Sequence, residues 1–211
     1  MEDIIQILKN VGAVITDSHL VYTSGKHGSV YVNKDALYPH TAESSKVGRM
    51  FADKTKDMNI DVVVAPALGG IILSQWTAYH LSQMLGKEIL GVYSEKTEEN
   101  NQILKRGYDK LVAGKNILIL EDITNTGGSV KKLVDEVKAK GGNIVQVCVM
   151  VNRDPKNVTS ELIGAPFSSL GTVPAEAWEE KDCPLCAQNV PINTTLGHGK
   201  KYLEEKKNIR A

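Results

Sequence analysis

The sequence predicts an α/β fold built on a doubly wound, mostly parallel sheet with helices on both faces. Three short runs of mainly aliphatic residues carry this prediction: VVVAPA at 62–67, ILIL at 117–120 and IVQVCVMV at 144–151. Runs this apolar are typical of strands buried on both faces, as parallel strands are. A helix-like segment follows each of the first two runs, which indicates crossover connections between parallel strands.

The N-terminal part of the sequence predicts two helices and a hairpin. Apolar residues recur at helical spacing over 4–11, and Gly12 is placed to end that helix. Two β-prone runs, 19–23 and 29–34, flank the stretch SGKHG, whose composition favours a tight turn. A second helix is expected over 41–58, because its apolar residues fall on one face.

Beyond this helix, strands and helices alternate. The run VVVAPA leads through Leu-Gly-Gly into the apolar helix IILSQWTAYHLSQML, and the strand ILGVY follows at 89–93. The run ILIL leads through a glycine-containing turn into the helix SVKKLVDEVKAK, which Gly-Gly ends before IVQVCVMV. Successive strand–helix–strand units are what a doubly wound fold requires.

Two stretches break this alternation. Residues 94–113 are mostly polar, and a connection this long inside a compact domain is usually a lid or a disordered segment. The tail from Ala165 onward contains prolines and little periodicity, so we expect it to cover the core as a cap. The sequence therefore predicts a single domain over 1–211. Its parts are a core at about 41–164 and a small hood formed by about 1–40 and 165–211.

Composition disfavours several classes of function. The 211 residues include 25 Lys and Arg and 25 Asp and Glu, so the chain lacks the basic excess typical of nucleic-acid binding. No apolar stretch reaches the roughly 18 residues that a membrane span needs, and MEDIIQILKN does not resemble a signal peptide. The 3 cysteines are an odd count, unlike a secreted disulfide framework. We expect a cytoplasmic protein with small-molecule partners, and neither nucleic acid nor membrane.

Two adjacent acids, Glu121 and Asp122, follow the run ILIL directly. In an open parallel sheet, ligands bind beyond the carboxyl ends of the strands, which is where these acids fall. The stretch NTGGS, from Asn125 to Ser129, is rich in small residues whose backbone N–H groups can hold a phosphate at a helix N-terminus. Carboxylates accept hydrogen bonds from ribose hydroxyls, so acids beside a phosphate loop indicate a sugar phosphate ligand.

A purely structural explanation is that the acids begin a loop and the glycines turn the chain. This explanation leaves two adjacent acids after a buried strand without a reason, because buried charges need partners. The patterns G-x-G-x-x-G and G-x-x-x-x-G-K-[ST] do not occur, so neither dinucleotide binding nor a P-loop is indicated. A serine-hydrolase elbow and a zincin helix are also excluded by pattern.

The stretch ILILEDITNTGGSV resembles the phosphoribosyl pyrophosphate signature of type I phosphoribosyltransferases. Three further segments are similar to orotate phosphoribosyltransferases: YTSGKHGSVYVNKDALYP, VVVAPALGG and VNR at 151–153. The similarity spans residues 20 to about 155, and the tail CPLCAQNVPINTTLGHGK looks like one bacterial and archaeal branch. The resemblance implies a fold like that of the type I phosphoribosyltransferases.

The resemblance also implies how phosphoribosyl pyrophosphate is bound. Glu121 and Asp122 would bind the ribose hydroxyls, and Asp122 would be catalytic. Mg²⁺ would bridge ribose and pyrophosphate oxygens, held mainly by the substrate and not by direct protein ligands. Backbone at Leu68, Gly69 and Gly70 would approach the pyrophosphate, unless these glycines serve only strand-to-helix packing. The 5-phosphate would be held by Thr126, Gly127, Gly128 and Ser129.

In the family, a lysine from the segment corresponding to 94–113 reaches the pyrophosphate, often across a dimer interface. Lys96 is our first choice for this catalytic and pyrophosphate-binding role, because it follows the strand end YSE. The family's further lysines and its His-Gly pair are replaced here by TEENNQ. Alternatively, any one basic residue of 94–113 is simply part of a solvated, charged loop. The other basic residues are Lys105, Arg106 and Lys110.

Three residues are candidates for binding orotate. Arg153 suits a planar, anionic ring as a stacking and charge partner. Asn125 stands where the family usually has a threonine that contacts the base, and its amide can still donate and accept hydrogen bonds, so we assign it to both substrates. Lys26 is either a phosphate or base contact or a plain turn lysine. Tyr31 and Lys34 are weaker candidates.

The resemblance implies a Mg²⁺-dependent pentosyltransferase that converts orotate and phosphoribosyl pyrophosphate to orotidine 5′-phosphate and pyrophosphate in UMP and pyrimidine biosynthesis. It also implies a homodimer. One alternative is transfer to another base, such as a purine. A second alternative is a non-catalytic regulator that binds phosphoribosyl pyrophosphate, which the altered lid segment favours and the lack of a basic face disfavours.

Cys183 and Cys186 form a C-x-x-C pair, which matches half of a zinc site. His198 or Cys148 would supply further ligands in that case, and otherwise the pair is free or packs within the tail. The remaining histidines are scattered and are expected to make ordinary hydrogen bonds: His19, His27, His40 and His80.

Overall fold

The computed structural model describes residues 3–22, 24–174 and 176–210. The chain divides into two compact units. The first consists of Met1–Ile7 and Lys34–Pro174, and the second of Leu8–Asn33 and Ala175–Ala211. The predicted sheet lies in the first unit, while short strands and the C-terminal tail form the second.

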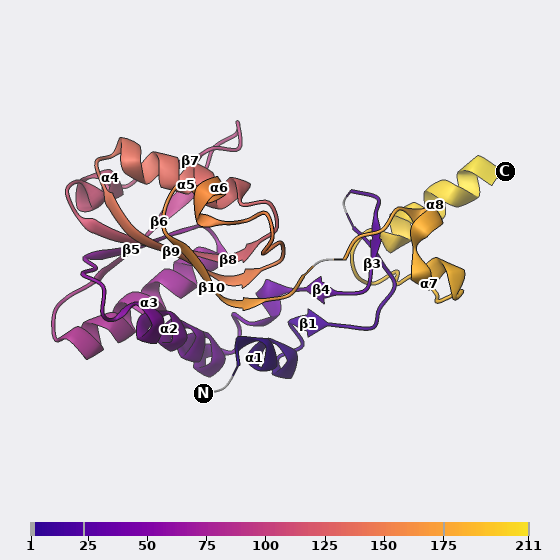
Figure 1. The fold of residues 1–211 in the computed structure, drawn as a ribbon, viewed down its shortest axis with the longest axis horizontal. Helices are drawn as coiled ribbons and strands as arrows, with labels where there is room; N and C mark the ends of the chain where they lie inside the picture. Colours follow the sequence, from indigo (N-terminus) through magenta and orange to yellow (C-terminus); the bar gives the residue numbers. More distant parts are fainter. Residues whose placement is uncertain (1–2, 23, 175, 211) are drawn as a thin grey trace. The chain divides into compact units, whose positions relative to one another are not determined.

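The first unit is built on a six-stranded sheet in the order β10-β9-β8-β5-β6-β7 (Figure 1). Neighbouring strands pair in parallel, except β6 and β7, which pair antiparallel. The predicted doubly wound, mostly parallel sheet is therefore confirmed. Its strands are β5 (Val62–Pro66), β6 (Leu90–Lys96), β7 (Gln102–Ile103), β8 (Asn116–Thr124), β9 (Asn143–Asn152) and β10 (Phe167–Thr172).

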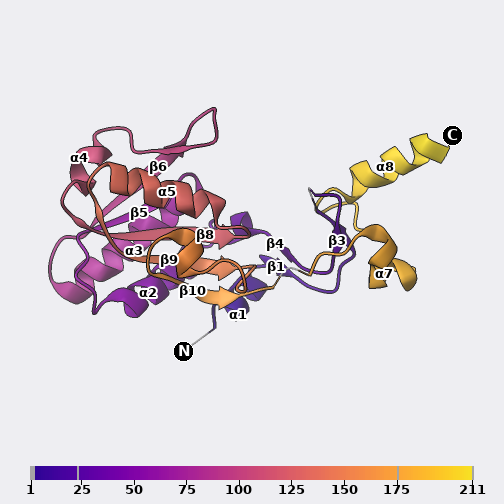
Figure 2. The ribbon, with the colours of Figure 1, turned by 45° about the horizontal axis from the view of Figure 1, so that its top comes forward.

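Helices cover both faces of this sheet. In two views, α2 and α3 lie on one side of the strands and α5 lies on the other (Figures 1 and 2). A 3-10 turn, Lys34–Ala36, precedes the first of these helices. The helices of this unit are α2 (Thr41–Thr55), α3 (Gly69–Leu85), α4 (Tyr108–Val112), α5 (Gly128–Ala139) and α6 (Ser160–Ile163).

The core consists of two layers, because successive residues of a strand point to opposite faces of the sheet. Along β8, Ile117 and Ile119 join an apolar cluster that includes Val130 and Val134 of α5. Leu118 and Leu120 alternate with them and are also fully buried. Burial on both faces explains why this strand reads as an unbroken aliphatic run.

The predicted pairing of 19–23 with 29–34 is wrong. β2 pairs antiparallel with β3, whereas β4 pairs with β1, a strand that precedes the predicted hairpin. The turn is shorter than predicted, because the N–H of Tyr22 donates to the carbonyl of Lys26 and brings β3 directly after the turn. These short strands of the second unit are β1 (Val14–Ile15), β2 (Leu20–Val21), β3 (His27–Gly28) and β4 (Tyr31–Val32).

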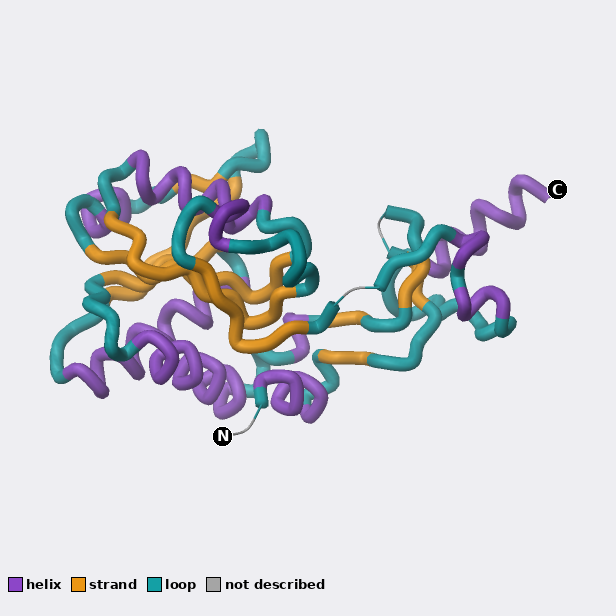
Figure 3. The backbone as a smooth tube through the Cα atoms, viewed as in Figure 1, coloured by secondary structure: helices purple, strands orange, loops and turns teal. Residues whose placement is uncertain are grey.

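The rest of the second unit is mainly loop and helix (Figure 3). Helix α1 (Ile4–Asn10) runs from the first unit into the second, and Gly12 follows it with φ of +71°, in the left-handed region. The C-terminal tail forms a 3-10 turn (Glu180–Asp182), α7 (Pro184–Ala187) and α8 (Gly199–Arg210).

Residues 94–113 are more regular than their polar composition predicts. β6 continues to Lys96 and pairs with β7, and α4 follows. Leu104 and Val112 are buried in the apolar cluster, so two side chains anchor an otherwise polar segment. The sheet also extends past residue 164, because β10 pairs with β9. β10 is a half-buried edge strand, and it therefore lacks the aliphatic run that indicates a central one.

Ile119 lies at the centre of the sheet and is fully buried. We expect Ile119→Ala to lower the free energy of unfolding by about 3 kcal/mol, because the truncation removes buried methyl groups and leaves a cavity. Leu162→Ala is the control, since Leu162 is 42% exposed and its truncation should cost less than about 1 kcal/mol. Urea denaturation measures both values, and equal losses would contradict the packing described here.

Candidate active site

The direction of chain progression reverses between β5 and β8. From β5 the chain passes through α3 to β6 on one side, and from β8 it passes through α5 to β9 on the other. Such a switch point leaves a crevice beyond the carboxyl ends of the two strands. The last pair of β5 with β8 joins Val64 and Ile119, and β8 then continues to Thr124 along β9 alone. Glu121 and Asp122 lie on this continuation.

The carboxylate of Asp122 is held by several neighbours. Lys34 Nζ lies 2.9 Å from Oδ2, and the hydroxyl of Tyr38 donates to the same oxygen at 2.9 Å. Oδ1 accepts a hydrogen bond from the N–H of Ile123 at 2.7 Å. Gly69, the first residue of α3, packs so closely that a Cβ would overlap both Tyr38 Oη and Asp122 Oδ2. Space alone therefore requires glycine at this position.

Asp122 changes the acidity of both of its side-chain partners. Burial, and then the negative charge of Asp122, raises the pKa of Tyr38 far above its ordinary value. Burial opposes the ammonium charge of Lys34, but attraction to Asp122 outweighs it and raises the pKa of Lys34. The phenol and the ammonium therefore both keep their protons at neutral pH and remain donors to Asp122.

Glu121 points to the opposite face of β8 from Asp122, because side chains alternate along a strand. It is 7% exposed, and its Oε1 accepts a hydrogen bond from the N–H of Asp122 at 3.1 Å. Ser129 of α5 also hydrogen-bonds to this carboxyl group. Burial, and then the charge of Asp122, raises the pKa of Glu121 to about 8. The two adjacent acids therefore point to opposite faces of the sheet and have different hydrogen-bonding partners, which limits the repulsion between them.

The loop after β8 enters α5 through Gly127. This residue has φ of +75°, and a Cβ on it would lie 2.9 Å from Ile163 Cδ1, so conformation and space both favour glycine. Its N–H donates to Thr124 Oγ1 at 3.0 Å, which closes the turn. The first N–H groups of an α-helix have no acceptor within the helix and carry its positive dipole end. Thr126, Gly128 and Ser129 present this end to the crevice.

Together these elements line a cleft of about 470 Å³. The acids Glu121 and Asp122 share it with three lysines, and the phosphate-loop residues form part of its wall. Ammonium groups and a helix N-terminus attract phosphates, whereas the carboxylates accept hydrogen bonds from hydroxyls. The cleft is thus suited to a sugar that carries phosphates at more than one position. The lysines are Lys34, Lys96 and Lys132.

The structure brings many of the predicted binding residues to this cleft, but several do not line it. Gly70 packs on Ala65, where a Cβ would come within 2.7 Å, so the packing explanation accounts for this glycine. Leu68 is 81% exposed, and Asn125 is also exposed on the loop. Predicted residues that line the cleft are Gly69, Lys96, Glu121, Asp122, Thr126, Gly128 and Ser129.

The other two orotate candidates have different surroundings. The N–H of Arg153 donates to the carbonyl of Thr124 at 2.9 Å, which puts Arg153 at the same edge of the sheet as the acids. Lys26 belongs to the second unit, where its ammonium lies 3.1 Å from Glu179 Oε1. Neither residue is part of the cleft lining.

The basic residues of 94–113 also separate into groups. Lys96 lines the cleft, whereas Lys105 and Arg106 both pair with Glu95, at 3.5 and 2.8 Å. Lys110 is exposed on α4. Of these four residues, Lys96 alone combines a position on the lid segment with a place in the cleft.

Sequence reasoning missed Tyr38 and Lys132, and it gave Lys34 little weight. Tyr38 and Lys34 both belong to the segment KDALYP. A hydroxyl and an ammonium group so close together in the sequence could have indicated partners for a buried carboxylate. Lys132 lies in α5, where its ammonium donates to the carbonyl of Asn100 at 2.6 Å. No local pattern distinguishes it from an ordinary exposed helical lysine.

Comparison with known proteins identifies the family of the chain. The profile of the family described as "Phosphoribosyl transferase domain" matches residues 33–163, and the chain belongs to this family. Orotate phosphoribosyltransferase from a Thermoanaerobacter species is 35% identical over 191 residues, which cover 90% of this chain and 94% of the relative. The Thermotoga maritima enzyme of that name is 32% identical, with 93% and 98% covered. Within the family, the chain belongs with the orotate phosphoribosyltransferases.

Solved structures support the fold. Orotate phosphoribosyltransferase from Aeropyrum pernix superposes with a TM-score of 0.60 at 22% identity, covering 80% of this chain and 92% of that one. The Mycobacterium tuberculosis enzyme gives a TM-score of 0.62 at 20% identity, covering 81% and 96%. Among the residues that the structure describes, no helix combines the length and apolar character needed to cross a membrane.

The raised pKa of Glu121 predicts how stability depends on pH. With a pKa of about 8 in the folded protein, this carboxyl group would keep its proton at pH values where a glutamate with the ordinary pKa of 4.5 has lost it. Stability should therefore fall as pH rises through this window, by roughly 1 kcal/mol per pH unit from this group. Glu121→Gln should flatten the decline, because the amide does not titrate.

Urea denaturation of both proteins between pH 5 and about 8.5 measures this slope. Glu161→Gln is the control, because Glu161 is exposed and its replacement should leave the slope as it is. If Glu121→Gln and the wild-type protein had the same slope, Glu121 of the wild-type protein would be ionised over the whole pH range.

Proposed function

We propose that this chain transfers the 5-phosphoribosyl group of phosphoribosyl pyrophosphate to orotate, which yields orotidine 5′-phosphate, the precursor of UMP, and pyrophosphate. The observation that carries the proposal is the joint presence of Glu121, Asp122 and a phosphate loop at one switch point. The named activity of relatives that are 32–36% identical supports orotate as the acceptor.

The phosphate loop would bind the 5-phosphate of the sugar. Thr126, Gly128 and Ser129 line the cleft at the N-terminus of α5, where backbone N–H groups and the helix dipole favour an anion. Gly127 would act through its conformation, since it shapes the loop without lining the cleft. The proposal thus divides the four residues into three contacts and one positioning residue.

The two carboxyl groups would bind the ribose hydroxyls. Asp122 is already fixed in place by Lys34 and Tyr38, so its free lone pairs are directed before the ligand arrives. Glu121 would accept a hydroxyl hydrogen bond as a carboxylate or donate one as a protonated acid. Its raised pKa means that both forms are accessible near neutral pH.

Mg²⁺ would accompany the pyrophosphate. This ion prefers oxygen ligands, and the carboxylate of Asp122 together with the deprotonated form of Glu121 fits that preference. We propose that substrate oxygens and water supply most of its coordination, with Glu121 and Asp122 facing it. When bound, the ion would neutralise part of the negative charge on the pyrophosphate.

The chain's own residues would then favour departure of pyrophosphate from the anomeric carbon. Negative charge grows on the leaving group, and the ammonium groups of Lys34 and Lys96, which both line the cleft, would stabilise it. Positive charge grows on the ribose, where the carboxylate of Asp122 would stabilise it. The hairpin of β6 and β7 carries Lys96, so this segment would both exclude water and supply charge.

Orotate would bind beside the phosphoribosyl site, at the same edge of the sheet. Arg153, Asn125 and Lys26 remain our candidates for orotate, on the resemblance to the family. Arg153 and Asn125 both follow strand ends at the ligand-binding edge of the sheet, which supports these two over Lys26. We also propose a cytoplasmic homodimer, and sedimentation of the purified chain tests the dimer.

Two rival functions have distinguishable consequences. Transfer to a purine base would keep the same phosphoribosyl site and change only the acceptor. A non-catalytic regulator would bind phosphoribosyl pyrophosphate without releasing pyrophosphate. The presence of Lys96 in the cleft favours an enzyme over the regulator, because binding of the 5-phosphate does not require it.

Pyrophosphate release tests the proposed activity directly. With phosphoribosyl pyrophosphate and Mg²⁺ present, we expect release with orotate and not with uracil, hypoxanthine or adenine. Asp122→Asn should reduce kcat/KM by about 100-fold or more, because the amide cannot offer the same charge to the ribose. Release with a purine alone would refute the orotate assignment, and tight substrate binding without release would favour the regulator.

Lys96→Ala tests the lid lysine. We expect kcat to fall by about 100-fold while binding of phosphoribosyl pyrophosphate changes little, since the charge acts mainly on the departing pyrophosphate. Lys105→Ala is the matched control on the same segment, because Lys105 pairs with Glu95. Steady-state kinetics and calorimetric binding separate the two effects, and equal activity in both variants would remove Lys96 from the mechanism.

A further inference from the structure

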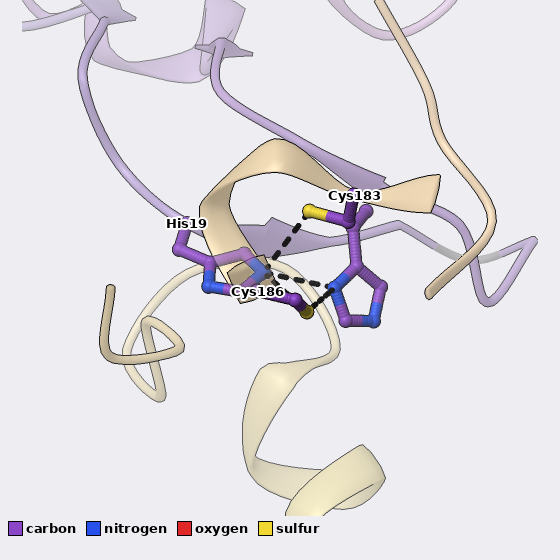
Figure 4. A group of neighbouring side chains, drawn as sticks. His19, Cys183 and Cys186 are labelled. Atoms are coloured by element: carbon purple, nitrogen blue, oxygen red, sulfur yellow. Dashed lines mark hydrogen bonds between the residues drawn. The ribbon is translucent and has the colours of Figure 1, made fainter. Parts of the chain in front are cut away.

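Four side chains that bind transition metals meet inside the second unit. His19 immediately precedes β2, His27 lies in β3, and Cys183 and Cys186 flank the start of α7. One ligand atom from each residue lies within 4.8 Å of all the others. Figure 4 shows His19, from the segment before β2, and the two cysteines at the start of α7 directed toward one another.

We propose that His19, His27, Cys183 and Cys186 bind a structural Zn²⁺ ion. The residue set is two histidines and two cysteines, a common donor set of structural zinc sites. Four protein ligands fill a tetrahedral shell and leave no position for substrate, so the ion would stabilise the fold and not take part in catalysis. The cleft described above is lined by residues of the first unit, so this site is a separate one.

The distances fit a tetrahedral ion. Bonds of about 2.0 Å to nitrogen and about 2.3 Å to sulfur place nitrogen and sulfur ligands roughly 3.6 Å apart. Both sulfurs lie 3.6 Å from His19 Nε2, and Cys186 Sγ lies 3.3 Å from His27 Nδ1. The two nitrogens are 2.8 Å apart, closer than the roughly 3.3 Å of a bound pair. A small rotation of either ring would accommodate the ion.

His19 is oriented as a zinc ligand. Its Nδ1 lies 2.7 Å from the carbonyl oxygen of Val190, an atom that can only accept a hydrogen bond. Nδ1 therefore carries the proton, and Nε2 presents its lone pair to the other three residues. A backbone carbonyl that fixes the second nitrogen in this way is a regular companion of metal-binding histidines.

The burial of the four residues suits a metal site and not a surface cluster. His19, His27 and Cys183 are 2%, 0% and 2% exposed, and Cys186 is half-buried. Thiol groups are weak hydrogen-bond donors and acceptors, so hydrogen bonds alone would hold two histidines and two cysteines together poorly. Zinc would bind the thiolates and neutral imidazoles much more strongly.

The second unit also has little else to hold its tail. Among the described side chains of 176–208, Cys183 and Gly199 are the only buried residues, so the tail contributes hardly any apolar core. Backbone contacts join it to the N-terminal strands, including Asn193 N–H to His19 O at 2.7 Å and a mutual pair between His27 and Trp178. Small units with so small a core usually need a metal or disulfides.

The sequence-based expectation was wrong about the further ligands, His198 or Cys148, and about the histidines His19 and His27. His198 and Cys148 are not among the ligands, and His19 and His27 are adjacent in space and not merely scattered. Cys148 lies in β9 of the first unit, where Ser168 donates to its sulfur at 3.4 Å. The C-x-x-C pair is a local motif, but Cys186 lies 167 residues from His19 and 159 from His27, so no local motif joins the cysteines to the histidines.

The test begins with the purified full-length chain. Mass spectrometric metal analysis should find zinc in equal molar amount to the protein, with the cysteines reduced. Replacement of zinc by Co²⁺ should produce the intense visible bands of a tetrahedral site and a thiolate charge-transfer band in the near ultraviolet. Cys186→Ser should lose most of the zinc and the charge-transfer intensity, and chelation of wild-type protein should lower its Tm.

Cys148→Ala and His198→Gln are the matched controls, since they change a cysteine and a histidine outside the group and should retain full zinc. Circular dichroism of Cys186→Ser checks that the sheet of the first unit is still folded. Metal-free wild-type protein that also gives no Co²⁺ spectrum would overturn the proposal. So would a disulfide between Cys183 and Cys186 in the native protein, or full zinc retention in a His19→Gln and Cys186→Ser double variant.

Discussion

The candidate active site depends on the point where β5 and β8 part. These strands pair as far as Val64 and Ile119, and then β5 ends and gives way to α3 while β8 continues beside β9. The continuation exposes one edge of β8 to a crevice. Asp122 stands on that edge, and the start of α3 passes so close to it that Gly69 cannot carry a side chain. Every other feature of the cleft is arranged around this separation of two strands.

Charge balance links the separation of the strands to substrate binding. Asp122 is paired with Lys34, and Lys34 also lines the cleft that the phosphates would enter. A polyanionic ligand and Asp122 therefore compete for the same ammonium group. Lys96 and Lys132 add positive charge at the cleft, and within the described part of the chain neither forms a salt bridge, so the cleft as a whole attracts anions.

The sequence predicts the central fold well, because buried parallel strands are read directly from aliphatic runs. It predicts the acids and the phosphate loop for the same reason, since both follow such a run without interruption. β10 escaped prediction because a half-buried edge strand carries no aliphatic signal. Tyr38 and Lys132 escaped because their importance comes from contacts with residues far away in the sequence, and the pairing of β1 with β4 escaped for this reason too.

Because Glu121 and Asp122 point to opposite faces of β8, a change in the length of this strand would change which acid faces which layer. The one register shift between β8 and β9 places the extra residue in β9, between the partners Ile144 and Gln146. The odd–even order of β8 from Ile117 to Asp122 is therefore unbroken. A deletion of one residue within this run would exchange the two acids between layers while leaving the motif EDITNTGGS readable. In recombined or engineered chains, the number of residues in β8 before the acids therefore matters as much as the motif itself.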